Sequence, residues 1–262
     1  MIKIKEVKIE ELADKIELYN IHVISPMDDM YEEGIIPSCN FYKIIEEDVI
    51  GYVAINNDKV MLQFHLDNRD RDDSSNIFKE ILNLLKVKKA LVNTNDPYFY
   101  NLCKKNEKKS EINDYLFHED SLVELKSPIE NIEITLAENK DLDSTLAYFK
   151  SIGMEGDFIN YYINLRILTS SIYLFKLNDS IIGSGEIRPS KSAKNYANVG
   201  MTVSTDYRKI GLGSYILSTL RKMANEKGLQ TVCSTDVTNI ASYKTIIKSG
   251  YKRYHEVYSI NF

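Results

Sequence analysis

The sequence predicts an α/β (α+β) fold made of two tandem units, each a mixed, mostly antiparallel central sheet flanked by helices. Three observations support this prediction. Short apolar strand patterns alternate with amphipathic helical patterns. Similar patterns recur about 130 residues apart. A strand, a turn with two glycines and a helix follow one another near residue 210. The length of 262 residues suits two small domains.

The composition is that of a globular protein and argues against several classes. Apolar residues make up 44% and charged residues 27%. No apolar run reaches the roughly 18–20 residues of a membrane span, and the N-terminal segment has no apolar signal core. We therefore expect a cytoplasmic protein with no membrane partner. The net charge is −5, and lysines are interleaved with acidic residues, which argues against nucleic acid as a partner.

Cysteine and histidine usage predicts neither a disulfide framework nor a metal site. The three cysteines (Cys39, Cys103 and Cys233) lie far apart with no CxxC spacing, and the four histidines are scattered. Buried free thiols are the expected state of the cysteines. We expect no metal.

The first unit begins as a short strand and an amphipathic helix, and the second unit begins in the same way. The matching apolar positions are Ile2, Ile4, Leu12, Ile16 and Tyr19, and then Ile132, Ile134, Leu142, Leu146 and Phe149. Each unit continues with a hairpin, "FYKIIEEDVIG" at 41–51 and "YLFKLNDSIIG" at 173–183. Later, "NTNDPYFYNLCKK" at 93–105 resembles "DVTNIASYKTIIKS" at 236–249, with a strand end, a polar turn and a helix in both.

The two units meet near Ser127-Pro128, which predicts domains at 1–127 and 128–262. We expect residues 115–126 to close the first sheet and 132–136 to begin the second. The second unit is then expected to contain helices at about 140–151, 157–168, 213–227 and 239–249. Its strands are expected within 171–188 as a hairpin, and at 197–204, 230–236 and 251–262.

The turn "DYRKIGLGSYIL" at 206–217 links the strand at 197–204 to a helix. The first N–H groups of a helix have no partner inside it, and the helix dipole adds positive charge there. Gly211 and Gly213 let a ligand approach the backbone, and Arg208 and Lys209 add two cations. The combination is suited to a phosphate or pyrophosphate. The alternative is that the glycines merely permit a tight turn.

Residues after the turn help to decide between a phosphate-binding turn and a purely structural one. Val203, Arg208, Gly211 and Gly213 form the pattern V-x-x-x-x-R-x-x-G-x-G. Asn239, Ser242, Lys248, Gly250 and Tyr251 follow as N-x-x-S…K-x-G-Y. Together these motifs resemble the GNAT family of N-acetyltransferases over roughly 130–262, and the first half resembles the same fold only in its element order.

The resemblance implies a site for acetyl-CoA. Backbone amides from Lys209 to Ser214 would hold the pyrophosphate, the 201–203 strand would pair with the pantetheine arm, and Asn239 and Ser242 would lie beside that arm. An ordinary helix N-cap is the alternative role for Asn239. The implied cofactor-binding residues are Met201, Thr202, Val203, Arg208, Lys209, Ile210, Gly211, Leu212, Gly213, Ser214, Asn239 and Ser242.

The first unit lacks this turn. Its equivalent segment, "LDNRDRDDSSN" at 66–76, has no glycine and has more aspartates than arginines. Such a loop would repel pyrophosphate. We therefore expect a single acetyl-CoA site, with 1–127 as a degenerate unit that completes the fold.

The catalytic groups are less clearly marked. The family often has a tyrosine acid seven residues after the helix-opening asparagine, but this chain has Ile246 there. Tyr243 is the nearest replacement as the acid, with a core position as its alternative. Glu186, within "IIGSGEIR", is the candidate base, with an exposed sheet face as its alternative, and Asp236 is a weaker candidate. A backbone N–H of the 201–203 strand would stabilise the oxyanion.

The resemblance implies an acetyl-CoA-dependent N-acetyltransferase that acts on a primary amine of a small molecule or a peptide, as a monomer or a homodimer. A non-catalytic acyl-CoA-binding or sensor module is the alternative, and Ile246 favours it. A plain nucleotide-binding protein is a third reading. The sequence carries no code for the amine.

Overall fold

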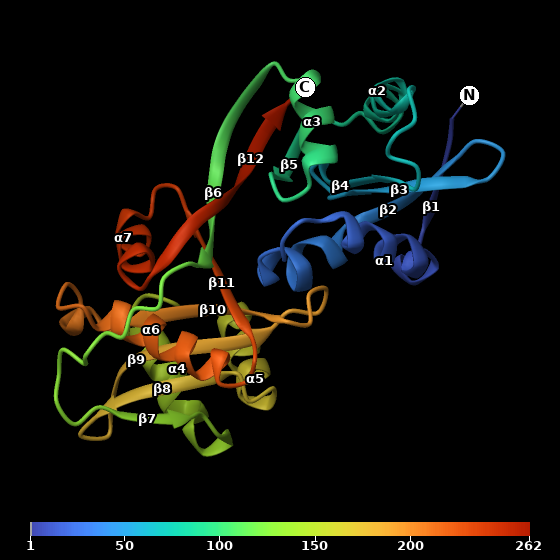
Figure 1. Ribbon diagram of the computed structural model, residues 1–262. Coiled ribbons are helices and arrows are strands. Elements are labelled where there is room, and N and C mark those ends of the chain that lie inside the picture. The colour runs from blue at the N-terminus through green and yellow to red at the C-terminus, as the bar shows by residue number, and fades with distance from the viewer. Residues whose placement is uncertain (1) are drawn as a thin grey trace.

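A computed structural model describes residues 2–262. One continuous sheet of twelve strands, in the order β1-β2-β3-β4-β5-β12-β6-β11-β10-β9-β8-β7, runs through both halves of the chain (Figure 1). The strands are β1 (Lys3–Val7), β2 (Asn40–Ile45), β3 (Val49–Ile55), β4 (Val60–Leu66), β5 (Lys89–Asn93), β6 (Lys109–Glu119), β7 (Glu133–Leu136), β8 (Ile172–Leu177), β9 (Ser180–Pro189), β10 (Tyr196–Val203), β11 (Gln230–Asp236) and β12 (Tyr251–Asn261).

Helices cover both faces of this sheet in each half, so that every half is a three-layer unit. They are α1 (Ala13–His22), α2 (Ser74–Leu85), α3 (Pro97–Lys105), α4 (Leu142–Ser151), α5 (Asp157–Leu168), α6 (Leu212–Asn225) and α7 (Ile240–Lys248). Short helical turns include η2 (Met30–Ile35) and η3 (Ile36–Ser38). The predicted fold class and the predicted elements of the second unit are confirmed.

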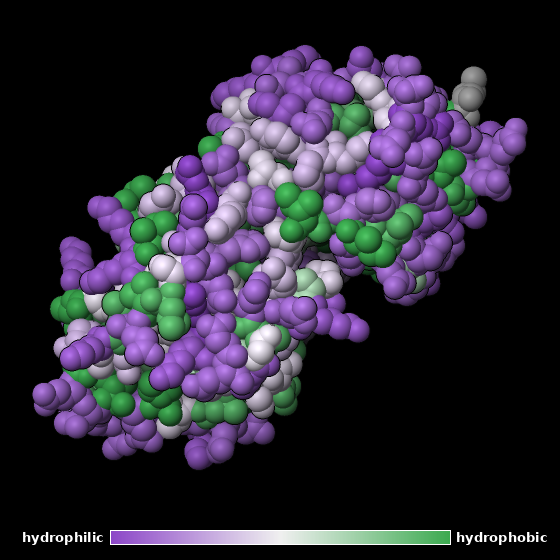
Figure 2. Space-filling view, viewed as in Figure 1, coloured by the Kyte–Doolittle hydropathy of each residue, from purple (hydrophilic) through white to green (hydrophobic). Residues whose placement is uncertain are grey.

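The two halves exchange strands, which the sequence did not predict. β6 of the first half lies between β11 and β12, and β12 of the second half lies between β5 and β6. We expected residues 115–126 to complete the sheet of the first unit. That expectation is wrong, because β6 pairs with β11 and β12 of the second half. In Figure 1, β6 and β12 run side by side from one lobe to the other. The space-filling view shows the two lobes meeting at a narrower waist (Figure 2).

Helix α6 packs closely on the hairpin of β9 in the second half. A Cβ atom on Gly183 or Gly185 would come within 2.6 Å of the side chains of Ile216 and Leu220. These two α6 residues are fully buried, which contributes roughly 1.5–3 kcal/mol for each side chain. The close approach fixes which face of β9 meets α6. Its alternate residues, Glu186 among them, must point to the other face.

Strands β10 and β11 separate soon after they begin. They are parallel, because the α6 crossover joins them, and their pairing joins Tyr196–Asn198 to Gln230–Val232. Within residues 2–262 no further pairing between them is found. The edge of β10 from Val199 to Val203 that faces β11 is consequently left without a strand partner on that side.

Candidate active site

Two glycines begin α6 at positions that favour this residue. Gly211 has a φ of +98°, a left-handed conformation that strains other residues. A Cβ atom on Gly213 would lie 3.2 Å from Met201 Sδ and from the Thr245 side chain. Unpaired N–H groups and the positive end of the helix dipole meet at this turn. It is therefore suited to bind an anionic group such as a phosphate.

A cavity of about 970 Å³ opens beside the turn, between the end of β10 and the beginning of α7. Ten residues of the predicted set line it: Met201, Thr202, Val203, Arg208, Lys209, Gly211, Gly213, Ser214, Asn239 and Ser242. The other two do not. Ile210 is 49% exposed to solvent, and Leu212 is buried in the core. The structure thus brings segments about 40 residues apart in the sequence to one cavity.

The cavity wall also contains residues that the sequence reasoning missed. Lys244 and Lys248 of α7 line it, together with Ile152 and Met154 from the α4–α5 loop. The Nζ atom of Lys248 lies 3.7 Å from the place that a Cβ of Gly211 would take. The signal was the spacing of the two lysines, because residues four apart share one helix face. With Arg208 and Lys209, four basic residues line this cavity.

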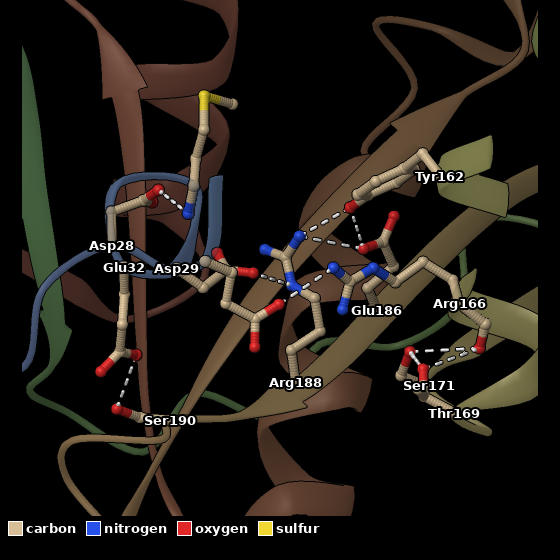
Figure 3. A network of polar contacts seen from close by, with 12 residues as sticks. Asp28, Asp29, Glu32, Tyr162, Arg166, Thr169, Ser171, Glu186, Arg188 and Ser190 are labelled. Atoms are coloured by element: carbon tan, nitrogen blue, oxygen red, sulfur yellow. Dashed lines mark hydrogen bonds and ion pairs between the residues drawn. The ribbon is translucent and has the colours of Figure 1, made fainter. Parts of the chain in front are cut away.

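The opposite face of β9 contains a buried polar network (Figure 3). Glu186 is 8% exposed, so the alternative of an exposed sheet position is wrong. Its Oε2 accepts a hydrogen bond from the Tyr162 hydroxyl and lies 3.1 Å from Arg188 Nη1. Arg188 also lies against β10, with Nη2 3.8 Å from the position of a Gly200 Cβ. Glu186 is in register with Gly200 on the β9 side of β10, one strand away from the edge of β10 that faces β11.

The other side of this network comes from the first half of the chain. Four acidic residues in and just before η2 reach β9, β11, α5 and the 190–192 loop, and we call these contacts the interface network. Asp28 accepts from Ser234, Asp29 lies 2.9 Å from Arg188 Nε, Glu32 accepts from the Ser192 N–H at 2.8 Å, and Glu33 lies 3.3 Å from Arg166 Nη2 and from Lys191 Nζ. Burial raises the pKa of Asp29 to about 6 against the opposing effect of Arg188.

Comparison with known families identifies this arrangement. Residues 8–120 match the family described as "Acetyltransferase (GNAT) domain", and residues 139–251 match the one described as "Acetyltransferase (GNAT) family". The chain belongs to the GNAT family. Its two GNAT domains lie in tandem, as the sequence predicted. No protein with curated annotation is significantly similar in sequence.

Solved structures of GNAT proteins share this whole architecture. A GNAT-family acetyltransferase from Colwellia psychrerythraea has 24% identity and a TM-score of 0.92 over 99% of both chains. A GCN5-related N-acetyltransferase from Sphaerobacter thermophilus has 10% identity and a TM-score of 0.66, over 98% of this chain and 94% of its own. A tandem GNAT protein from the clavulanic acid biosynthesis pathway has 9% identity and a TM-score of 0.65, over 99% and 98%. At these identities the likeness shows the fold.

In the first GNAT domain, side chains of the domain itself lie at the helix start that corresponds to the beginning of α7. Asn239 caps α7 by accepting from the Ser242 N–H, and Asp96 caps α3 in the same way through Phe99. Asp96 is buried, and its Oδ1 lies 3.2 Å from Arg69 Nη1. The Arg69 guanidinium also lies over the Tyr98 ring, at 5.0 Å. Side chains of the domain itself therefore occupy the beginning of α3.

Tyr243 lies apart from the cavity of the second GNAT domain. Its ring packs edge-on against Tyr115 and Phe117 of β6, at 5.6 and 5.5 Å between ring centroids. Ile246 is buried in the core on the same side of α7. Asp236 is exposed and accepts from Thr238, which lowers the pKa of its carboxyl. The structure therefore does not bring Tyr243 to the cavity wall.

Neither a membrane-spanning helix nor a metal cluster is found among residues 2–262. No helix among them is long and apolar enough to cross a membrane. No group of three or more histidine, cysteine or acidic side chains among them is arranged to hold a metal ion. All three cysteines are buried free thiols, as expected.

Proposed function

We propose that this GNAT protein transfers an acetyl group from acetyl-CoA to a primary amine of a small molecule or a peptide. The observation that carries the proposal is the glycine turn of α6, which opens into a cavity that reaches the unpaired edge of β10. The working site lies in residues 128–262, and residues 1–127 form the degenerate domain.

The residues present fit this donor. The amides of the turn from Lys209 to Ser214 would hold the pyrophosphate, and the basic residues of the cavity wall would offset its charge. The main chain of Met201 to Val203 has no strand partner on the β11 side, so its polar groups are free to pair with the pantetheine arm. Asn239 uses its oxygen as the cap of α7, which leaves its amide hydrogens for the arm.

Neutralising the amine is the main demand on the protein side chains. A lysine-like amine has a pKa near 10.4, so deprotonation at pH 7 costs about 4.6 kcal/mol. We assign Glu186 as the base, because it is a buried carboxylate next to Gly200, one strand away from the open edge of β10. When bound, acetyl-CoA supplies a thioester that the neutral amine can attack, with the thiolate as the leaving group. Arg188, 3.1 Å away, and the Tyr162 hydroxyl hold the Glu186 carboxylate in place.

One observation favours a second function. Ile246 stands where the family often has a tyrosine, and Tyr243 packs against β6 instead of facing the cavity. A non-catalytic acyl-CoA sensor would keep the cavity and need no acid. Release of CoA with a panel of amines separates the two, because a sensor binds acetyl-CoA without releasing CoA.

Calorimetry tests the site itself. We expect one acetyl-CoA per chain, and sharply weaker binding in Gly211→Val, because the side chain would enter the turn. Gly228→Val is the matched control. Gly228 also has a positive φ, +75°, so the strain is similar, but it lies at the other end of α6 in open space. Two equivalent sites, or equal affinity in both variants, would contradict the proposed site.

A further inference from the structure

Alternate residues of β10 point to opposite faces of the sheet, and each face borders a different part of the candidate active site. Val199 and Met201 pack with α6, so Asn198, Gly200 and Thr202 point to the other face. Thr202 confirms this, since its hydroxyl bonds to Tyr148 of α4 at 2.8 Å. The cavity lies on the α6 and α7 side. The interface network lies on the other face of the sheet, where Ser234 of β11 and Arg188 of β9 contact Asp28 and Asp29.

Asp28 lies beside the gap that begins where β10 and β11 separate. Cys233 packs in the α6-side core, so the next residue of β11, Ser234, faces the interface network. Its hydroxyl donates to Asp28 Oδ2, and the Met30 N–H donates to Oδ1 at 2.9 Å. The β10–β11 pairing ends two residues before Ser234. Asp28, a residue of the first GNAT domain, thus contacts β11 of the second domain next to the point where β10 and β11 separate.

The charges of the interface network are unevenly compensated. Asp29, Glu33 and Glu186 each lie within 4 Å of an arginine. Among residues 2–262, Asp28 has no basic side chain within that distance, and neither does Asp114 of β6. Asp114 accepts from the Tyr31 hydroxyl at 3.1 Å and from Asn113 at 2.7 Å. Two partly buried carboxylates therefore have no direct ion pair, although Asp28 lies close enough to Arg188 to help raise the pKa of that guanidinium.

A second observation indicates a ligand at the same place. Asn198 is 1% exposed, and neither its amide nitrogen nor its amide oxygen has a hydrogen-bond partner. Leaving a buried polar group unpaired costs about 1–3 kcal/mol. Asn198 is in register with Arg188 on β9 and with Val232 on β11, at the point where β10 and β11 separate. Its amide thus points to the face of the interface network, at the closed end of the gap.

We infer that the first GNAT domain supplies the acceptor-binding wall of the second: Asp28 and Asp114 bind the ammonium of an acceptor that carries at least two amino groups, and the Asn198 amide positions its reacting nitrogen. The inference rests on the proposed function. Two carboxylates without a direct ion pair match a second positive charge on the acceptor. The buried amide oxygen can accept from the nitrogen that enters the gap.

The experiment compares 1,4-diaminobutane with butylamine, which lacks only the second amino group. With the full-length chain, calorimetry should show tighter binding of the diamine. Asp28→Asn should weaken diamine binding at least tenfold and lower kcat/KM for the diamine similarly, while butylamine changes less than threefold. Asp143→Asn, an exposed carboxylate on α4, is the matched control. Equal binding of the diamine and the monoamine, or undiminished diamine binding in Asp28→Asn, overturns the inference.

Asn198→Leu provides an independent test. Leucine has a similar volume and removes an unpaired buried amide, so thermal stability should stay equal or rise. Diamine binding should nevertheless fall at least tenfold. A clear loss of stability with unchanged diamine affinity would make Asn198 a structural residue and contradict the inference. Because binding is measured apart from turnover, diamine binding without CoA release would refute the proposed enzyme and leave the acceptor wall standing.

Discussion

Lys248 extends the anion site beyond the glycine turn, because its ammonium lies beside Gly211 from a different helix. We expect Lys248→Gln to weaken acetyl-CoA binding roughly fivefold, or about 1 kcal/mol, since this exposed cation is screened by solvent. Calorimetry at two salt concentrations checks this, and the loss should shrink at high salt. Lys252→Gln on β12 is the control. Equal effects of the two changes would mean that Lys248 is not close to the bound pyrophosphate.

A Tyr243 variant tests whether this residue donates a proton to the leaving thiolate. Its ring packs on Tyr115 and Phe117 and is absent from the cavity wall, so we expect Tyr243→Phe to retain kcat within about threefold. A free thiol has a pKa near 8.5, which makes a thiolate an acceptable leaving group without an acid. Steady-state kinetics decides. A fall of about 100-fold with unchanged cofactor affinity would restore Tyr243 as the acid.

Glu186→Gln keeps the shape of the proposed base and removes its charge. The rate at pH 7 should fall by about 100-fold, the low end of acid–base contributions, and should recover as the pH approaches the pKa of the amine. The pH–rate profile is the measurement. Because the change also alters the contact with Arg188, acetyl-CoA affinity must be shown to be unchanged. A profile with the shape of the parent's would remove Glu186 from the mechanism.

The residues of the glycine turn could be predicted from the sequence, whereas those of the interface network could not. Gly211 and Asn239 have local roles, in a left-handed turn and in a helix cap, and Gly213 belongs to the same turn. Roles of this kind depend on neighbouring residues and therefore leave a pattern in a single sequence. Asp28 and Asn198 are different. Asp28 is bonded to Ser234, 206 residues along the chain, and Asn198 lies where β10 parts from β11, 34 residues further on; nothing near either residue in the sequence marks these contacts.

Strands β6 and β12 show the same limit at the scale of elements. The position of β12 could be predicted from the turn at Gly250 and the residues after it, whereas β6 (Lys109–Glu119) overlaps the expected segment 115–126 only in part. Alternation of apolar residues says only that a strand forms. It does not say which strand becomes its neighbour. The two units have similar strand patterns, so either could accept the final strand of the other. The structure resolves this choice by exchange, with β12 pairing with both β5 and β6.

His118 makes the shared strands sensitive to acid. Burial lowers the pKa of His118 to about 4, with a further contribution from His255, whose own pKa burial also lowers. Folding therefore favours neutral His118, so its contribution is complete above pH 6.5 and is lost as the pH falls towards 4. Thermal melts should show His118→Gln to be less sensitive to pH over this window, by on the order of 2 kcal/mol.

His65 responds to acid in the same way, because burial also lowers its pKa to about 4. The His118 variant should therefore lose only part of the acid sensitivity. His22→Gln on α1 is the control for a histidine outside the shared strands. A pH dependence as steep as that of the parent would show that β6 and β12 tolerate the charged ring.

At the scale of the whole molecule, the exchange means that neither GNAT domain is complete alone. The partners of β5 along one edge and of β11 along one edge both come from the other half. The same exchange places the segment around η2 against β9 and β11. A degenerate domain without a cofactor turn is thereby tied to the working one through backbone ladders as well as through ionic contacts.

The connector between the halves should consequently be dispensable once the chain has folded. Residues 126–128 are exposed, and only the segment up to Val123 is bonded to α6, through Ser218 and Arg221. We expect a chain cut at a protease site placed at 126–128 to elute as one intact species in size-exclusion chromatography. The fragments should separate only in denaturant, because β5–β12, β6–β11 and β6–β12 pairing holds them together. Residues 1–127 expressed alone should not fold, since β5 would lose its β12 partner and β6 both of its neighbours. Two separately folded fragments after the cut would mean that each domain can close its own sheet.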